Sequence, residues 1–154
     1  MWKDEDLYDD TWGEVILMCG LPGTGKDTWI RENHPGLPTV SLDDLRRESG
    51  VKPGDNQGRV VQAAKERAKA YLRAKQPFVW NATCLTPLRA QQIELFERYG
   101  ARVRIVYLET NWAKNLRRNA GRTDAVPEDI IDRMLEKLEP PGQAEAQAVE
   151  WICL

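Results

Sequence analysis

The stretch Gly-Leu-Pro-Gly-Thr-Gly-Lys-Asp-Thr at residues 20–28 decides the fold. It follows an apolar run at residues 15–19 that is typical of a buried strand, and it leads into a segment with helical character. Glycines allow a tight turn that points successive backbone N–H groups at an anion, and the positive end of the following helix adds to that attraction. The stretch therefore predicts a phosphate-binding loop, as opposed to a glycine-rich turn without a ligand. The residues predicted to bind the nucleotide are Gly20, Gly23, Thr24, Gly25, Lys26, Asp27 and Thr28.

Asp27 follows the loop lysine at a position where such loops usually carry Ser or Thr, whose hydroxyl contacts Mg²⁺. A carboxylate beside a triphosphate repels it unless a metal ion lies between them. Asp27 is therefore a candidate Mg²⁺ ligand, either directly or through water. The alternative is that Asp27 caps the start of the helix, where an acidic residue is favourable in any case.

The composition indicates one soluble domain of 154 residues with a net charge of −2. That charge argues against a strong non-specific attraction to nucleic acid or to an anionic membrane. The three cysteines have no metal-ligand spacing and are interpreted as reduced thiols. No signal peptide or membrane span is recognisable, so a cytoplasmic protein is expected. We expect an acidic extension over residues 1–12 and a single domain over residues 13–154.

Strand-like and helical segments alternate along the chain. Strands are expected near residues 15–19, 39–42, 78–81, 102–108 and 149–153, with helices near 25–33, 59–75, 87–100, 112–119 and 128–138. Crossovers of this length predict an α/β fold, with a parallel sheet covered by helices on both faces. Ligands of such sheets bind beyond the carboxyl ends of the strands, so the turns near residues 20, 43, 83 and 110 are expected to converge.

Asp43 and Arg46 stand three residues apart where the second strand is expected to pass into a helix. Positions three apart share one face of a helix. A hydroxyl that accepts a phosphoryl group needs a base, and Asp can take its proton within hydrogen-bond reach. An arginine nearby can hold a phosphate. The alternative is that Asp43 or Asp44 only caps the helix and Arg46 is exposed.

Four segments occur in an order that resembles the P-loop polynucleotide 5′-kinase family. They are Gly-Leu-Pro-Gly-Thr-Gly-Lys-Asp-Thr-Trp at 20–29, Leu-Asp-Asp-Leu-Arg at 42–46, Ala-Thr-Cys-Leu-Thr-Pro-Leu-Arg at 82–89, and Leu-Arg-Arg-Asn-Ala-Gly-Arg at 116–122 followed by Ala-Val-Pro at 125–127. The segments resemble the bacteriophage type, and still more the kinase module that bacterial RNA end-healing enzymes join to an HD-type phosphohydrolase. The resemblance implies a five-stranded parallel sheet of order 2-3-1-4-5 with a helical lid.

The resemblance also implies roles for individual residues. Asp43 would be the general base, Arg46 would contact the acceptor, and Thr83 would touch the substrate or a neighbouring phosphate. Arg118 and Arg122 would belong to the lid over ATP, with Arg122 at the transferring phosphate, where a guanidinium stabilises the spreading charge. Lys26, Asp43, Arg46 and Arg122 are thus the predicted catalytic residues. The implied substrates and cofactors are ATP and Mg²⁺, and the implied partners are a nucleic acid with a 5′-hydroxyl end and a phosphohydrolase and ligase, fused or acting alongside.

One departure from the family concerns the end of the third strand. Some relatives have an acidic residue there, whereas this chain has Asn81 and Ala82, so metal binding is expected to be organised differently. The predicted function is transfer of the γ-phosphate of ATP to the 5′-hydroxyl of RNA or DNA in end healing. Two alternatives stay open. One is a small-molecule kinase, which the modest charge favours; the other is a nucleotide-dependent regulator that transfers nothing, against which the Asp43 and Arg46 pair argues.

Overall fold

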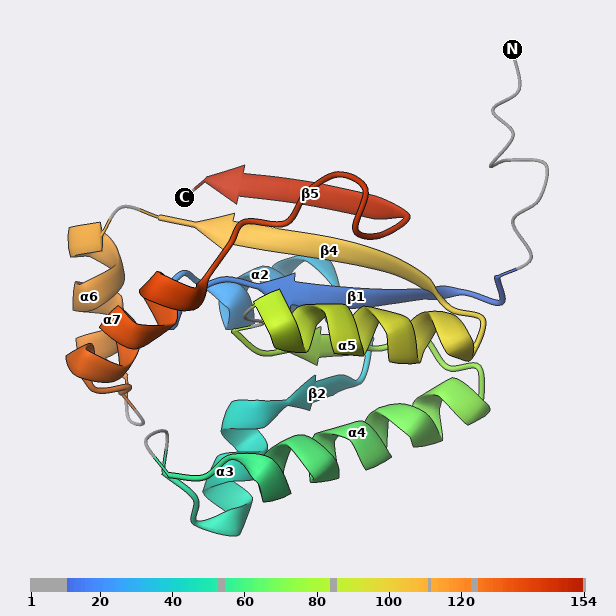
Figure 1. The fold of residues 1–154 in the computed structure, drawn as a ribbon, viewed down its shortest axis with the longest axis horizontal. Helices are drawn as coiled ribbons and strands as arrows, with labels where there is room; N and C mark the ends of the chain where they lie inside the picture. Colours follow the sequence, from blue (N-terminus) through green and yellow to red (C-terminus); the bar gives the residue numbers. More distant parts are fainter. Residues whose placement is uncertain (1–10, 53–54, 84–85, 111, 123–124, 154) are drawn as a thin grey trace.

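The protein folds into one parallel sheet with helices around it (Figure 1), and the computed structural model describes residues 11–52, 55–83, 86–110, 112–122 and 125–153. The predicted extension over residues 1–12 therefore lies almost entirely outside the described residues. The strands are β1 (Glu14–Cys19), β2 (Thr39–Ser41), β3 (Val79–Asn81), β4 (Arg102–Glu109) and β5 (Ala148–Cys153). The helices are α2 (Lys26–Asn33), α3 (Leu42–Ser49), α4 (Gly58–Arg73), α5 (Thr86–Arg98), α6 (Trp112–Ala120) and α7 (Glu128–Lys137).

All five strands pair in parallel in the order β2-β3-β1-β4-β5, which confirms the predicted sheet and its strand order. The predicted elements are found within a few residues of their expected bounds. One difference is informative: Leu42, predicted to end a strand, begins α3. The reason is Ser41, whose hydroxyl accepts a hydrogen bond from the backbone N–H of Asp44 at 3.4 Å and so caps the helix. The alternative in which Asp43 or Asp44 provides the cap is wrong.

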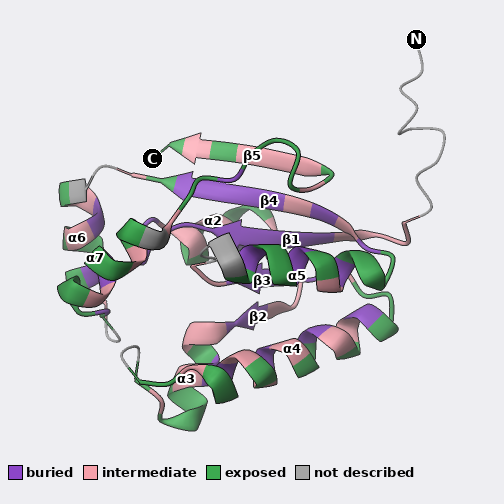
Figure 2. Cartoon of the chain, in the orientation of Figure 1, coloured by how far each residue is buried: buried purple, intermediate pink, exposed green. Residues whose placement is uncertain are grey.

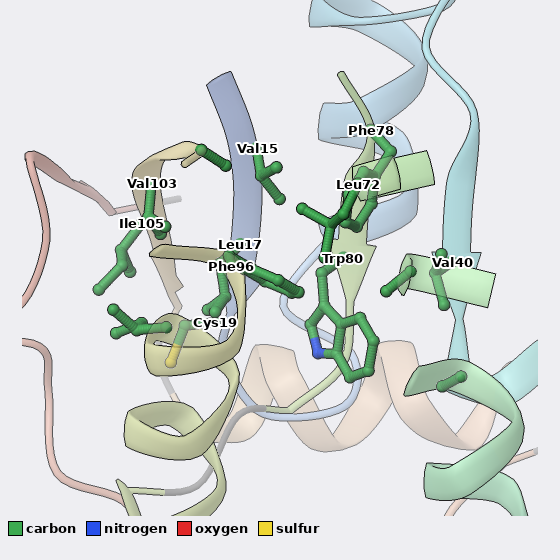
Figure 3. Close-up of a cluster of buried hydrophobic side chains, with 14 of the residues drawn as sticks. Val15, Leu17, Cys19, Val40, Leu72, Phe78, Trp80, Phe96, Val103 and Ile105 are labelled. Atoms are coloured by element: carbon green, nitrogen blue, oxygen red, sulfur yellow. The ribbon is translucent and has the colours of Figure 1, made fainter. Parts of the chain in front are cut away.

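The two faces of the sheet carry separate apolar clusters. On one face, α4 and α5 pack on alternate residues of β1, β3 and β4, with Trp80 and Phe96 in the centre (Figure 3). On the other face, Ile30 of α2 packs on Ile16 and Met18 of β1. The inner strands are buried along most of their length, as Figure 2 shows, because helices cover both faces. Packing of helices on both faces of the sheet holds the carboxyl ends of the strands in fixed positions.

Helices α6 and α7 lie beyond the carboxyl ends of the strands (Figure 1), where the predicted lid was expected. Behind them, Arg89 of α5 is almost fully buried and forms two hydrogen bonds with the Glu145 carboxylate, at 2.8 and 3.1 Å. The same guanidinium donates to the carbonyl of Glu139 at 2.8 Å, so it ties α5 to the chain between α7 and β5.

Among the described residues, no helix has the length and apolar character that crossing a membrane requires.

Candidate nucleotide-binding and phosphoryl-transfer site

A cavity of about 820 Å³ opens at the carboxyl edge of the sheet. Its wall is contributed by four distant parts of the chain: the phosphate loop with α2, strand β2 with the start of α3, the end of β3, and the end of α6 with the residues that follow. The residues of the predicted site that line it are Gly23, Gly25, Lys26, Asp27, Thr28, Asp43, Arg118 and Arg122. Gly20, Thr24, Arg46 and Thr83 do not line it, and each has a different position described below.

The phosphate loop needs its glycines for two separate reasons. Gly23 and Gly25 have φ values of +86° and +96°, a region that side chains disfavour. Space is the second reason: a Cβ at Gly23 would lie 2.6 Å from the carbonyl oxygen of Asn115, and one at Gly20 would lie 2.7 Å from that of Leu108. The loop therefore packs directly against the backbone of α6 and the end of β4. Gly25, in the left-handed conformation, is the N-cap of α2, so the positive end of that helix is presented at the loop.

Lys26 is held across the loop. Its ammonium donates hydrogen bonds to the carbonyl oxygens of Gly20 at 2.7 Å and Leu21 at 3.0 Å. Burial lowers the pKa of Lys26 to about 8, although the nearby Asp43 carboxylate opposes that shift. The hydroxyl of Thr24 is also internal to the loop, because it donates to Leu21 at 2.8 Å and is buried. Thr24 thus shapes the loop, whereas Lys26 faces the cavity.

Asp43 is the most strongly engaged carboxylate of the cavity. One of its oxygens accepts from the Arg46 guanidinium, and the other accepts from Nη2 of Arg122 at 2.8 Å. Although burial acts in the opposite direction, these two guanidinium groups hold the pKa of Asp43 below its usual value. Arg46 also donates to Oε1 of Gln57 at 3.2 Å, and its side chain is only 18% exposed. The alternative of an exposed Arg46 is therefore wrong: it braces Asp43.

Asp27 lies on the cavity wall in the first turn of α2, next to Lys26. Its Oδ1 accepts a hydrogen bond of 2.6 Å from the amide of Asn81, at the end of β3. Because Gly25 occupies the N-cap, Asp27 does not cap the helix. A carboxylate fixed beside the phosphate loop is a suitable Mg²⁺ ligand, since this ion takes one or two carboxylates together with phosphate oxygens and water. Within the described part of the chain, no three His, Cys, Asp or Glu side chains gather as a metal centre made of protein ligands alone would require.

Thr83 supports the start of the phosphate loop through its backbone. Its carbonyl accepts from the N–H of Gly20 at 3.3 Å and from the Cys19 thiol at 3.6 Å. Arg118, by contrast, has an exposed side chain on α6 that contributes to the cavity wall.

The structure also shows functional candidates that the sequence analysis missed, above all Asn119, which is buried at the end of α6. An asparagine near a helix end is common, and only its tertiary partners set it apart.

The sheet order and the glycine loop define a nucleotide-binding domain with the P-loop kinase fold. The chain belongs to the AAA domain family, whose sequence model matches residues 15–141. A putative kinase from Chloroflexus aurantiacus superposes with a TM-score of 0.73 over 94% of this chain and 86% of that one, at 14% identity. Kti12 of Chaetomium thermophilum, solved with ADP-AlF3, gives a TM-score of 0.69 over 90% and 88%, at 12% identity.

A gluconokinase from Sinorhizobium meliloti has the same fold, with a TM-score of 0.60 over 94% of this chain and 83% of that one, at 21% identity. Among curated sequences, a UPF0200 protein of Thermococcus gammatolerans is 36% identical over 70 residues, which is 44% of this chain and 34% of the relative. The matched segment thus spans about a third of the length of that relative. These similarities show the fold and the family. The identity of the phosphoryl acceptor is inferred below from the residues of the cavity and from the sequence motifs.

Proposed function

We propose that this protein is an ATP-dependent phosphotransferase that moves the γ-phosphate of ATP to an alcohol, with the 5′-hydroxyl end of RNA or DNA as the acceptor. The observation that carries the proposal is the position of Asp43. Its carboxylate lines the same cavity as the phosphate loop and accepts a hydrogen bond from Arg122, a residue of the predicted lid. A nucleotide-dependent switch has no use for a carboxylate there, whereas a phosphoryl acceptor needs a base.

Binding of ATP follows from the loop. Its N–H groups and the N-terminus of α2 would hold the phosphates, and the Lys26 ammonium would exchange the carbonyls of Gly20 and Leu21 for phosphate oxygens. Arg118 and Arg122, which line the same cavity, would balance the negative charge that spreads over the transferring group. Magnesium bound at Asp27 would supply further neutralisation of the β- and γ-phosphates.

Transfer requires a proton acceptor beside the attacking oxygen. The acceptor hydroxyl would form a bond to the γ-phosphorus while the bond to the β–γ bridging oxygen breaks, and its proton would pass to Asp43. The lowered pKa of Asp43 keeps the carboxylate ionised but makes it a weak base. It is therefore suited to orient the hydroxyl and to accept the proton late, when the new bond to phosphorus has made the alcohol acidic.

The polynucleotide acceptor rests on the four sequence segments that resemble polynucleotide 5′-kinases. In that setting the product, a 5′-phosphate end, is what a ligase consumes, and a phosphohydrolase prepares the opposite end.

One observation favours a second candidate, a kinase of a small alcohol. The cavity wall carries as many acidic as basic side chains, namely Asp27, Glu32, Asp43 and Asp44 against Lys26, Arg31, Arg118 and Arg122. Polynucleotide-binding surfaces usually carry excess positive charge. The gluconokinase neighbour agrees with this candidate.

A transfer assay with γ-labelled ATP and Mg²⁺ distinguishes these acceptors. The substrates are an RNA and a DNA oligonucleotide with 5′-hydroxyl ends, the same oligonucleotides carrying a 5′-phosphate, and a panel of sugars and nucleosides. We expect label on the 5′-hydroxyl oligonucleotides alone, because a 5′-phosphate blocks the attacking oxygen. Label only on a sugar or nucleoside supports the second candidate. Label only in free phosphate, with every acceptor present, contradicts both.

A further inference from the structure

Asn119 makes an unusual pair of hydrogen bonds. Its Nδ2 donates to the carbonyl of Val126 at 2.6 Å, and its Oδ1 accepts from the N–H of the same residue at 3.0 Å. Both residues are buried, with 3% and 4% of their surface exposed. An asparagine amide carries a donor and an acceptor in one plane, so it pairs with a peptide group as a neighbouring strand would. The side chain thereby ties the end of α6 to Val126, on the other side of Arg122 in the sequence.

Arg122 lies between these two residues in the sequence. Its backbone N–H donates to the carbonyl of Asn119 at 3.1 Å, and its guanidinium reaches Oδ2 of Asp43 at 2.8 Å. Asn119 thus holds the chain on both sides of Arg122. Its carbonyl accepts from the backbone N–H of Arg122, and its side-chain amide pairs with the backbone of Val126, four residues after Arg122.

The backbone of Asn119 also lies against the phosphate loop. A Cβ on Gly23 would lie 3.0 Å from the Asn119 nitrogen, so the loop approaches this turn of α6 as closely as a glycine allows. One buried residue is consequently in contact with the phosphate loop through its backbone and with Val126, beyond Arg122, through its side chain. The phosphate loop and Arg122 must keep a fixed relative position if both are to contact the phosphoryl group during its transfer.

We propose that Asn119 is a positioning residue that sets Arg122 relative to the phosphate loop during phosphoryl transfer. This inference rests on the proposed function, since it takes Arg122 to act on the transferring group. Asn119 itself touches neither the cavity nor the substrate. A misplacement of about 1 Å at a group that orients the reaction costs roughly a hundredfold in rate. Loss of the Asn119–Val126 hydrogen-bond pair should thus lower the rate of phosphoryl transfer and change the affinity for ATP far less.

The experiment is a double-mutant cycle on the full chain with Asn119→Ala and Arg122→Ala. In the wild-type background we expect Asn119→Ala to lower kcat by about 30-fold to 100-fold, with KM for ATP changed by less than about threefold. In the Arg122→Ala background the same substitution should change kcat by less than about threefold, because the group that it positions is gone. Asn119→Asp should lower kcat at least as much as Asn119→Ala, because it sets a carboxylate oxygen against the buried Val126 carbonyl.

Two controls separate positioning from loss of stability. Leu72→Ala empties a buried site in α4 away from the cavity and should lower the melting temperature without lowering kcat. Asn33→Ala removes another helix-end asparagine, whose amide donates to the Trp29 carbonyl at 2.9 Å on the exposed surface, and should change neither quantity appreciably. Folding of every variant is checked by circular dichroism and by binding of a fluorescent ATP analogue.

Independent effects of the two substitutions, or an Arg122→Ala variant as active as the wild type, would overturn the inference. The same holds if Asn119→Ala only lowers the melting temperature and leaves kcat unchanged. Failure of the proposed acceptor is distinguishable, because a wild type that hydrolyses ATP but labels no acceptor contradicts only that assignment. The cycle is then measured on hydrolysis, where water replaces the alcohol and the same coupling is expected.

Discussion

Asp43 and Asp44 are adjacent carboxylates in the first turn of α3, and each pairs with the arginine three residues later, Arg46 or Arg47. By sequence the two pairs are alike, yet their surroundings differ. The side chains of the first pair are 29% and 18% exposed, whereas those of the second are 55% and 56% exposed. Arg122, 79 residues further along the chain than Asp43, donates a hydrogen bond to the carboxylate of the first pair. The comparison shows that the role of a charged pair depends on what the tertiary structure packs around it.

The largest difference is expected between Asp43→Asn and Asp44→Asn. Loss of the base should lower kcat for phosphoryl transfer by about 10²–10⁴-fold, while the affinity for ATP stays within a few-fold of the wild type. Asp44→Asn should change kcat by less than about threefold, because that exposed carboxylate has no part in the proton transfer. Steady-state kinetics with γ-labelled ATP measure both. Similar losses of kcat in the two variants would show that Asp43 and Asp44 do not differ in function. Full activity in Asp43→Asn would show that Asp43 is not the base.

The arginines offer a second pair of substitutions. Arg46→Ala should lower kcat by about 10–100-fold, since Asp43 loses the group that orients it and no longer has a fixed position beside the acceptor. Arg47→Ala should leave transfer unchanged, because an exposed ion pair contributes little to stability and Arg47 itself does not line the cavity. The rates are measured at saturating ATP and acceptor. Equal activities of the two variants would show that Arg46 does not support Asp43.

The pH dependence of ATP binding sharpens the comparison through Lys26, which lies near Asp43. The pKa of Lys26 is lowered to about 8, so the cation that binds phosphate is lost as the pH rises through that value. We expect the affinity for ATP to fall there by up to about tenfold per pH unit. Removing the attraction of Asp43 lowers the pKa of Lys26 further, so in Asp43→Asn the fall should begin at a lower pH.

Asp44→Asn serves as the matched variant in this titration and should leave the midpoint where it is in the wild type. Fluorescence titration of an ATP analogue between pH 6.5 and about 9.5 covers the window around the lowered pKa of Lys26, which is about 8. An affinity that is flat across this range, or a midpoint that Asp43→Asn leaves in place, would show that Lys26 and Asp43 do not interact as the structure indicates.

The smallest effect concerns the start of α3, on which both acidic residues depend. Ser41→Ala removes the cap on Asp44 and should cost about 1 kcal/mol of unfolding free energy. For a domain of this size that lowers the melting temperature by roughly 2–4 °C. Ser49→Ala, at the exposed end of the same helix, is the control and should change the melting temperature by less than about 1 °C. Calorimetry of the two variants is sufficient, and equal shifts would argue against Ser41 as the cap.

Much of the fold and part of the candidate site were predictable because their signals are local. The strand, glycine loop and helix at residues 14–33 follow one another directly, and the alternation of apolar runs with helical segments predicted the parallel sheet. Asp27 and Asp43 were predicted for the edge of the sheet where they are found. The predicted contact of Arg46 and Thr83 with the substrate stays a prediction. The structure adds that Arg46 donates to Gln57 and that the Thr83 carbonyl accepts from Gly20, contacts for which the local sequence pattern holds no signal.

By itself, the sequence determined that this chain forms a nucleotide-binding α/β domain, since glycine geometry and hydrophobic periodicity act over a few residues at a time. Only the tertiary structure decided which of two neighbouring carboxylates is enclosed, which arginine meets it, and that Asn119 and Arg89 are buried. The Asp43–Arg122 and Arg89–Glu145 pairs join residues 79 and 56 positions apart, and the backbone of Asn119 lies against Gly23 of the phosphate loop. Such pairings arise when whole elements pack, and a linear pattern carries no mark of them.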